Sequence, residues 1–246
     1  GRVMLNVRCE SPRYLRLTTI SRDGATGWSQ PEFQEALYDP ICNASLIRLP
    51  SRDGKSRLLF ANPDSHTSPK AIRAWGGQPR ENITLRLSYD EGRTWPVAKS
   101  LGAERGGYTS LAAGPDGTIY CLYERGYSSD NELNTRWLTV ASLNLEWLTE
   151  GTDSLGPASD SSKKEGLFET TTLWPAYARN RPNYRIPAIL LAPNGDLLAF
   201  AEKRVDGPSD LGDHDLVMKR SRDKGKTWGD DVVLFDDGAN DSTDPT

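Results

Sequence analysis

A short sequence pattern occurs twice in this chain of 246 residues, and a looser copy stands near its beginning. Residues 88–95 (Ser-Tyr-Asp-Glu-Gly-Arg-Thr-Trp) and 221–228 (Ser-Arg-Asp-Lys-Gly-Lys-Thr-Trp) share the pattern Ser-x-Asp-x-Gly-x-Thr-Trp, and residues 21–28 form a degenerate copy with displaced glycines. The copies start 67 and 133 residues apart, close to one and two units of one period. Self-similarity at such a period predicts a repeat architecture.

The residue types in the pattern predict a stiff turn. An aspartate can accept backbone N–H bonds across a turn, a glycine adopts the unusual φ, and a tryptophan packs between strands to anchor the turn. We therefore expect Asp90, Trp95, Asp223 and Trp228 to have structural rather than catalytic roles.

The sequence between the copies is almost entirely of β type. Two hairpins are predicted, over residues 111–123 with a Pro-Asp-Gly turn and over residues 189–200 with a Pro-Asn-Gly turn. Further strands are indicated by short alternating or apolar runs, and no stretch has a helical period; these runs are residues 14–20, 57–60, 82–87 and 137–140. An all-β chain with a fixed repeat favours a propeller.

Composition narrows the classes of partner and site. The net charge is -4 and both signs are mixed along the chain, so the sequence lacks the clustered basic face typical of nucleic-acid-binding proteins. No apolar run approaches the ~20 residues of a membrane span. Two histidines, His66 and His214, are too few for a His-rich metal site, and no cofactor is expected. Three widely spaced cysteines argue against a disulfide framework, although one bridge stays open.

The Ser-x-Asp-x-Gly-x-Thr-Trp pattern is the Asp-box of the sialidase family, and the chain resembles this family over most of its length. The resemblance implies a sialidase-type β-propeller, six-bladed in the family, of which about four blades' worth of sequence is present here. Residues 1–148 resemble the C-terminal half of such a propeller and residues 168–246 its N-terminal part. Residues 149–167 form a polar linker expected at the surface. Asp-boxes also occur in non-enzymatic propellers, so they indicate fold rather than function.

Three arginines match family positions. Arg185 lies in Tyr184-Arg-Ile-Pro187, which is followed by a further family-like run at residues 199–204, and Arg8 ends a Leu-Asn-Val-Arg strand. Arg80 precedes the second Asp-box, with Arg73 and Arg86 as rivals for the same role. The resemblance implies that Arg185, Arg8 and Arg80 bind the carboxylate of sialic acid, which guanidinium groups match bidentately.

Two further motifs supply the remaining chemistry that the resemblance implies. Tyr108, in Gly107-Tyr-Thr-Ser-Leu111, resembles the family's nucleophile, since sialidases attack with a tyrosine rather than a carboxylate. Glu124, in Leu122-Tyr-Glu-Arg-Gly126, resembles the glutamate that pairs with the first arginine.

The acid/base is expected to be an aspartate in the loop at residues 205–215. The family pattern points best to Asp210, with Asp213 as the second choice and Asp206 and Asp215 as competitors.

The sequence departs from the family in two ways. The order of segments is rotated, and the glutamate that should activate the tyrosine falls in a hairpin that precedes Gly1. Glu10 lies on the wrong side of Arg8 for this role. Three explanations are open: a permuted protein cleaved in two, a second chain or copy that supplies the remainder, and a four-bladed derivative.

The sequence as a whole predicts an exo-α-sialidase that releases terminal sialic acids from sialylated glycans with retention. It is expected to need a missing segment or partner chain for activity. The alternatives are a catalytically incomplete sialic-acid-binding propeller, a trans-sialidase, and a hydrolase that prefers a deaminated sialic acid.

Overall fold

The computed structural model describes residues 1–66, 78–127, 135–155, 165–175, 182–207, 209–236 and 238. Within them, strands dominate and α1 (Leu145–Leu148) is the single helix. The predicted all-β class is confirmed. No helix among the described residues is long and apolar enough to cross a membrane.

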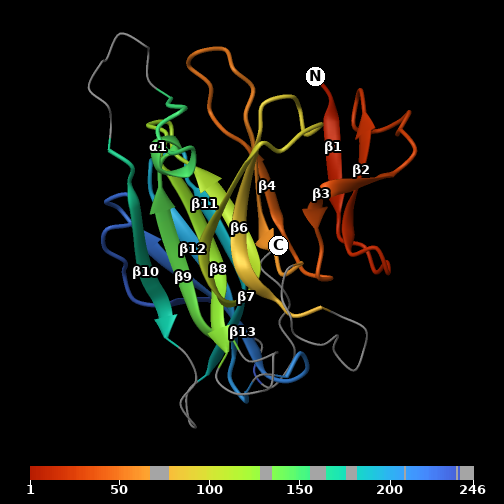
Figure 1. Ribbon diagram of the computed structural model, residues 1–246. Helices are drawn as coiled ribbons and strands as arrows, with labels where there is room; N and C mark the ends of the chain where they lie inside the picture. Colours follow the sequence, from red (N-terminus) through yellow and green to blue (C-terminus); the bar gives the residue numbers. More distant parts are fainter. Residues whose placement is uncertain are drawn as a thin grey trace.

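The strands form three antiparallel sheets (Figure 1). The first contains β1 (Val3–Val7), β2 (Leu15–Ser21) and β3 (Glu32–Tyr38). The second contains, in spatial order, β10 (Phe168–Pro175), β9 (Thr135–Leu143), β8 (Ile119–Tyr127), β7 (Val97–Ala113), β6 (Glu81–Ser88), β5 (Leu58–Pro63) and β4 (Ser45–Arg48). The third contains β11 (Asn183–Leu191), β12 (Leu197–Arg204), β13 (His214–Ser221) and β14 (Val232–Phe235).

The long strand β7 joins two halves of the second sheet. It pairs with β6 from Val97 to Arg105 and with β8 from Gly106 to Ala113, with register shifts in both ladders. One strand therefore passes from one group of strands to the next, and the residues at the change of partner lie between the two groups.

The hydrophobic core lies between successive groups of strands. Ile119, Cys121 and Tyr123 of β8 belong to a cluster shared with β4–β7, whereas Tyr120 and Leu122 belong to a cluster shared with β11–β13. Side chains alternate between the faces of a strand, so a strand with apolar residues at every position is buried on both faces. A third cluster, around Phe60 and Trp95, connects the first and second sheets.

The Asp-box turns have the predicted geometry. Asp90 accepts the Thr94 N–H at 2.8 Å, and Gly92, at φ 81°, donates its N–H to the Ser88 hydroxyl at 2.9 Å. The box at residues 221–228 repeats these bonds at 2.9 and 2.8 Å. The degenerate copy at residues 21–28 makes the same two kinds of bond, although its threonine is one position nearer to the aspartate. The bonds from threonine lower the pKa of Asp90 to about 2.

Both hairpins are also confirmed, with Gly117 at φ 90° and Gly195 at φ 89° in their turns.

The polar linker predicted at residues 149–167 was expected at the surface, and for the first residues of this segment that expectation is wrong. Asp153 is buried and holds the fully buried Arg57 through two bonds of 2.7 Å, and Leu155 packs into the core. A buried guanidinium requires such a partner, which a polar composition alone does not reveal. Residues 156–164 of the predicted linker lie outside the described residues.

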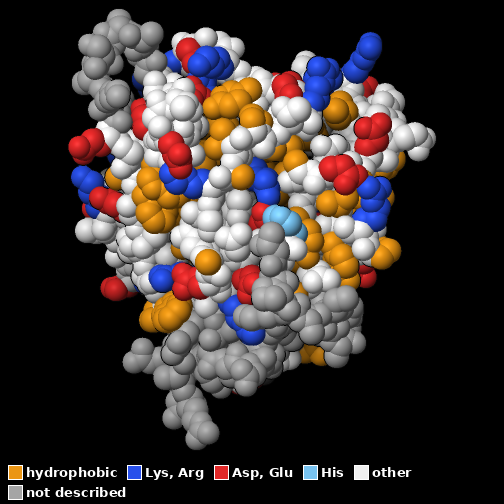
Figure 2. All heavy atoms as spheres, in the orientation of Figure 1, with side chains coloured by type: hydrophobic (Ala, Val, Ile, Leu, Met, Phe, Trp, Pro, Cys, Tyr) orange, Lys and Arg blue, Asp and Glu red, His pale blue; other side chains and the backbone are white. Residues whose placement is uncertain are grey.

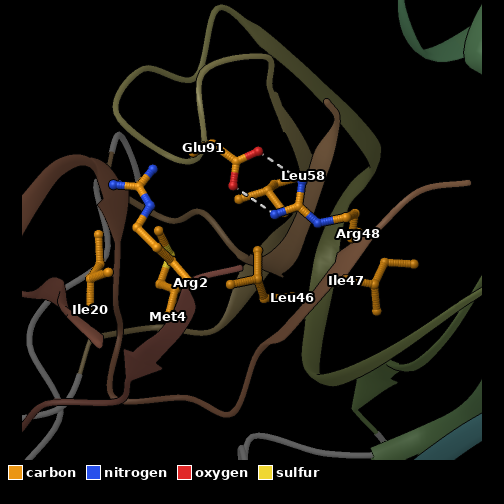
Figure 3. A pocket seen from close by; sticks show the side chains of 8 residues that line it. All are labelled: Arg2, Met4, Ile20, Leu46, Ile47, Arg48, Leu58 and Glu91. Atoms are coloured by element: carbon orange, nitrogen blue, oxygen red, sulfur yellow. Dashed lines mark hydrogen bonds and ion pairs between the residues drawn. The ribbon is translucent and has the colours of Figure 1, made fainter. Parts of the chain in front are cut away.

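A pocket lies where the first sheet meets the second (Figure 3). Apolar side chains, among them Met4, Ile20 and Leu46, line it, and an ion pair of 2.6 Å between Arg48 and Glu91 borders it. None of the residues predicted to act on substrate lines this pocket.

Candidate active site

Tyr108 lies on β7 immediately after the change of partner, where two glycines allow a close approach to β8. A Cβ on Gly107 would stand 2.1 Å from Glu124 Oε2, and one on Gly106 would stand 2.9 Å from the Glu124 carbonyl oxygen. The Tyr108 N–H donates to Glu124 Oε2 at 3.0 Å. The Gly-Gly pair is therefore required for the position of Tyr108 over Glu124.

Glu124 is a buried acceptor for two strands. It is 2% exposed and accepts bonds from Arg185 Nε at 3.1 Å and from the Ile186 N–H at 3.3 Å, besides that from Tyr108. Ile186 has a φ of 54°, a rare value for a β-branched residue, at an irregularity in the pairing of β11 with β12. The contact between Arg185 and Glu124 that the sequence suggested is present. Burial would lower the pKa of Arg185, but the charge and hydrogen bond of Glu124 raise it overall.

The three predicted arginines gather around the Tyr108 side chain. Arg8, which is exposed, donates from Nη1 to the Tyr108 hydroxyl at 3.3 Å. The Cζ atoms of Arg80 and Arg185 each lie 5.4 Å from the centre of the Tyr108 ring, within cation–π range. Arg80 is buried and also donates to the Ile41 carbonyl at 2.5 Å.

The rivals of Arg80 are placed differently. Arg86 forms an ion pair with the buried Asp64, which also contacts His66. Arg73 lies outside the described residues.

Asp210 lies between two arginines. Its Oδ1 is 3.3 Å from Arg185 Nη1 and 2.7 Å from Arg204 Nη1, while its side chain is 71% exposed. Partial burial alone would raise the pKa of Asp210, but Arg204, together with Arg185 and His214, lowers it overall.

The competing aspartates have other surroundings. Asp215 is buried and paired with Lys203 at 2.7 Å, and Asp206 is exposed. Burial, followed by the charges of Asp215 and Asp206, raises the pKa of Asp213. A raised pKa suits a general acid, so Asp213 remains the second choice.

The sequence did not reveal a group of charged residues behind Asp210. Glu202 and Arg204 point to one face of β12, and Glu202 accepts from Arg204 Nε at 3.0 Å and faces His214 Nδ1 at 2.7 Å. The only signal was the spacing of Glu202 and Arg204 by two, which places side chains on one face of a strand.

The surroundings of the Tyr108 hydroxyl are less complete. Over the part of the chain that the structure describes, this hydroxyl has no hydrogen bond to a carboxylate; its partner is Arg8. Arg8 directly follows β1, which is the edge strand of the first sheet. Val3, Leu5 and Val7 of β1 are each more than 40% exposed.

Charges of both signs are interspersed on the face of the molecule shown in Figure 2, with no extended basic region.

No protein-family model matches the chain. It is 35% identical over 153 residues to a sialidase of Micromonospora viridifaciens, a match that covers 60% of this chain and 21% of that protein. A sialidase of Bacteroides fragilis is 32% identical over 131 residues, covering 50% and 22%. An exo-alpha-sialidase of Aspergillus fumigatus is 28% identical over 154 residues, covering 58% and 35%. The chain is therefore related to the sialidase family, and its matches span about a fifth to a third of these relatives' lengths.

Solved structures agree at the level of the fold. An α-L-arabinofuranosidase of Fusarium graminearum aligns with a TM-score of 0.56 at 14% identity, covering 93% of this chain and 62% of that one. An intramolecular trans-sialidase of Ruminococcus gnavus aligns with a TM-score of 0.50 at 12% identity, covering 83% and 37%. The fold is thus of the sialidase propeller type, whereas the number of blades and the domain boundaries stay predictions.

Proposed function

We propose that this chain carries most of the active site of an exo-α-sialidase that hydrolyses terminal sialic acids with retention. The observation that supports this most strongly is the gathering of Arg8, Arg80 and Arg185 around Tyr108. Three guanidinium groups around one phenol make a site for an anionic sugar, because a substrate carboxylate can pair with them. A neutral phenol can then approach the anomeric carbon without repulsion from that carboxylate.

In the proposed reaction, the Tyr108 oxygen bonds to the anomeric carbon while the glycosidic bond breaks. Asp210 protonates the departing oxygen, and in the second step it takes a proton from the water that displaces Tyr108. The two arginines on Asp210 keep it ionised in the free protein. A substrate carboxylate that pairs with Arg185 would weaken the contact between Arg185 and Asp210. The pKa of Asp210 would then rise, which would allow Asp210 to donate a proton as a general acid.

Tyr108 also needs a base, since a free phenol with a pKa near ~10 is a poor nucleophile at neutral pH. We propose that the base is a glutamate on a strand that pairs with the edge of β1 that has no partner strand among the described residues. Because Arg8 directly follows β1, an antiparallel neighbour would begin beside Arg8 and the Tyr108 hydroxyl. The exposed Val3, Leu5 and Val7 support the presence of such a neighbour.

The test combines intact-mass measurement of the purified particle with an assay on a fluorogenic aryl sialoside. We expect very slow turnover or none from a verified single chain, and turnover from a particle that contains a further polypeptide or copy. Robust turnover by the single chain would show that the base lies within these 246 residues. Binding of a sialic-acid analogue without turnover in every form would instead favour the binding-only alternative.

The acid/base assignment has its own test. Asp210→Asn should slow natural sialosides far more than aryl sialosides, whose good leaving groups hardly need protonation. The matched variant Asp213→Asn should slow both substrates little. The reverse pattern would assign the role to Asp213, and equal slowing of both substrates by Asp210→Asn would leave Asp210 only a positioning role.

A further inference from the structure

His214 lies between two hydrogen-bond acceptors behind the loop that carries Asp210. The ring is 4% exposed, and its residue pairs with Arg204 across the β12–β13 ladder. Its Nδ1 is 2.7 Å from Glu202 Oε1, and its Nε2 is 3.1 Å from the carbonyl oxygen of Ser209, the residue before Asp210. One ring therefore connects β12 to the loop backbone.

The protonation state of the ring follows from these partners. A neutral imidazole carries one N–H, whereas a carboxylate and a carbonyl are both acceptors. The two contacts are complete only when both ring nitrogens carry a proton. We propose that His214 is a positioning residue whose doubly protonated form ties the Asp210 loop to Glu202; this inference rests on the role proposed for Asp210.

Glu202 joins this contact to Asp210 by a second route. It accepts from Arg204 Nε at 3.0 Å, and Arg204 Nη1 reaches Asp210 Oδ1 at 2.7 Å. The loop is thus held twice: through its backbone by His214 and through the Asp210 carboxylate by Arg204. Glu202 is itself buried, and a buried carboxylate requires cationic or hydrogen-bonding partners such as Arg204.

The charges around His214 come from three directions. Strand β12 presents Glu202 and Arg204, the loop presents Asp210, and the preceding residue on the chain is Asp213. Asp215, the next residue on β13, points to the opposite face and pairs with Lys203. Glu202 and Asp210 are carboxylates that both contact Arg204, and a protonated ring of His214 adds a second cation beside Glu202.

Loss of a ring proton would remove one of the two contacts. The hold on the loop should therefore be weaker when the ring carries a single proton. Asp210 would then be placed less precisely against the departing oxygen of the substrate, which affects the proton-transfer step rather than binding.

The experiment is amide hydrogen exchange of loop residues 205–213, corrected for intrinsic rates, at pH 5.5 and pH 8. In the unaltered protein we expect protection of the loop to be about tenfold greater at pH 5.5, as for loss of one charge-assisted bond. His214→Gln should abolish this difference, whereas His66→Gln, at the exposed histidine, should keep it. The proposal would be overturned if loop protection in the unaltered protein were the same at pH 5.5 and pH 8. It would also be overturned if the difference between the two pH values persisted in His214→Gln.

These exchange measurements on the unaltered protein and the two histidine variants need no turnover, so they separate this inference from the proposed activity. If the active form is in hand, His214→Gln should lower kcat for natural sialosides about tenfold with KM little changed, and should slow aryl sialosides less. Equal slowing of both substrates would also contradict a role through Asp210. A protein with no sialidase activity but with the pH-dependent loop would refute the proposed function and leave the contact between His214 and the loop intact.

Discussion

The two sides of the candidate site are built differently. On one side, β8, β11 and β12 hold Glu124, Arg185 and Arg204, each nearly inaccessible and each in an ion pair. On the other side, Arg8 stands at the end of an edge strand, is exposed, and reaches only the Tyr108 hydroxyl among the contacts described. The first side is fixed by folding, whereas the second side depends on what binds there.

The difference has an energetic basis. Burying an ion pair costs desolvation that its Coulomb energy barely offsets, so such pairs add little stability and serve mainly to hold charge in place. A preorganised charge is useful where a substrate charge must be met without rearrangement. The side with Glu124, Arg185 and Arg204 (the paired side) therefore suits a permanent binding surface. The side with Arg8 (the open side) suits a contact that another strand or the substrate completes.

The largest effect is expected at the residue that both sides share. Tyr108→Phe should lower kcat on an aryl sialoside about 10³-fold or more, because it removes the proposed nucleophile. The variant should remain folded, since the ring stays in place between Arg80 and Arg185. Steady-state kinetics on the active form measures this.

The matched control is Tyr184→Phe. The Tyr184 hydroxyl donates to Asp231 Oδ2 at 3.0 Å, and its ring stacks on Trp174. This variant should keep most of the activity. Unchanged turnover in Tyr108→Phe would show that Tyr108 is only a packing residue. The two sides of the site would then have no shared catalytic residue.

The next effect concerns the stability of the paired side. Glu124→Gln leaves the buried Arg185 without its buried carboxylate partner, with only the exposed Asp210 remaining, and should lower the free energy of unfolding by about 3 kcal/mol. Glu104→Gln breaks a pair with Arg125 in which both side chains are at least a third exposed, and should cost less than about 1 kcal/mol. Urea denaturation followed by tryptophan fluorescence measures both. Equal losses would mean that burial does not distinguish the two pairs.

A smaller effect is expected on the open side. Arg8→Ala should weaken binding of a sialic-acid analogue about tenfold, as for one charge-assisted hydrogen bond. It should change the free energy of unfolding by no more than about 0.5 kcal/mol, because Arg8 is exposed. Arg13→Ala, at another exposed arginine of the same loop, is the control and should change neither quantity. Calorimetric titration gives the affinities, and an Arg8→Ala variant that binds normally would remove Arg8 from the site.

The sequence predicted the parts of the site that short motifs encode. Tyr108, Arg185 and Glu124 each lie in a local pattern, and the structure brings these residues together. The contacts of His214 depend on the register between β12 and β13, which no local pattern specifies.

The buried part of the predicted linker was missed for a related reason. Arg57 and Asp153 are distant in sequence, and each reads as a surface residue until the fold pairs them. The Asp-box turns were predictable even in the degenerate copy, because Ser21 and Asp23 make their contacts within a few residues.

The smallest effect is expected away from both sides of the site, at an Asp-box. Hydrogen bonds from Thr94 lower the pKa of Asp90 to about 2, below the ordinary value of about 3.9. A carboxylate whose pKa is lower in the folded state adds stability above its unfolded pKa and loses this contribution as pH falls toward its folded pKa. Because the turn is largely in contact with solvent, we expect Asp90→Asn to lower the free energy of unfolding by only about 1 kcal/mol at pH 6. The difference between Asp90→Asn and the unaltered protein should shrink as pH falls from about 4 through 2, because Asp90 becomes protonated in the folded state as well. Asp230→Asn, at an exposed carboxylate outside the box, should show no such trend, and activity should be unchanged in both variants. Urea unfolding at several pH values measures this, and a difference that stays constant down to pH 2 would show that the Asp90 hydrogen bonds do not depend on its charge.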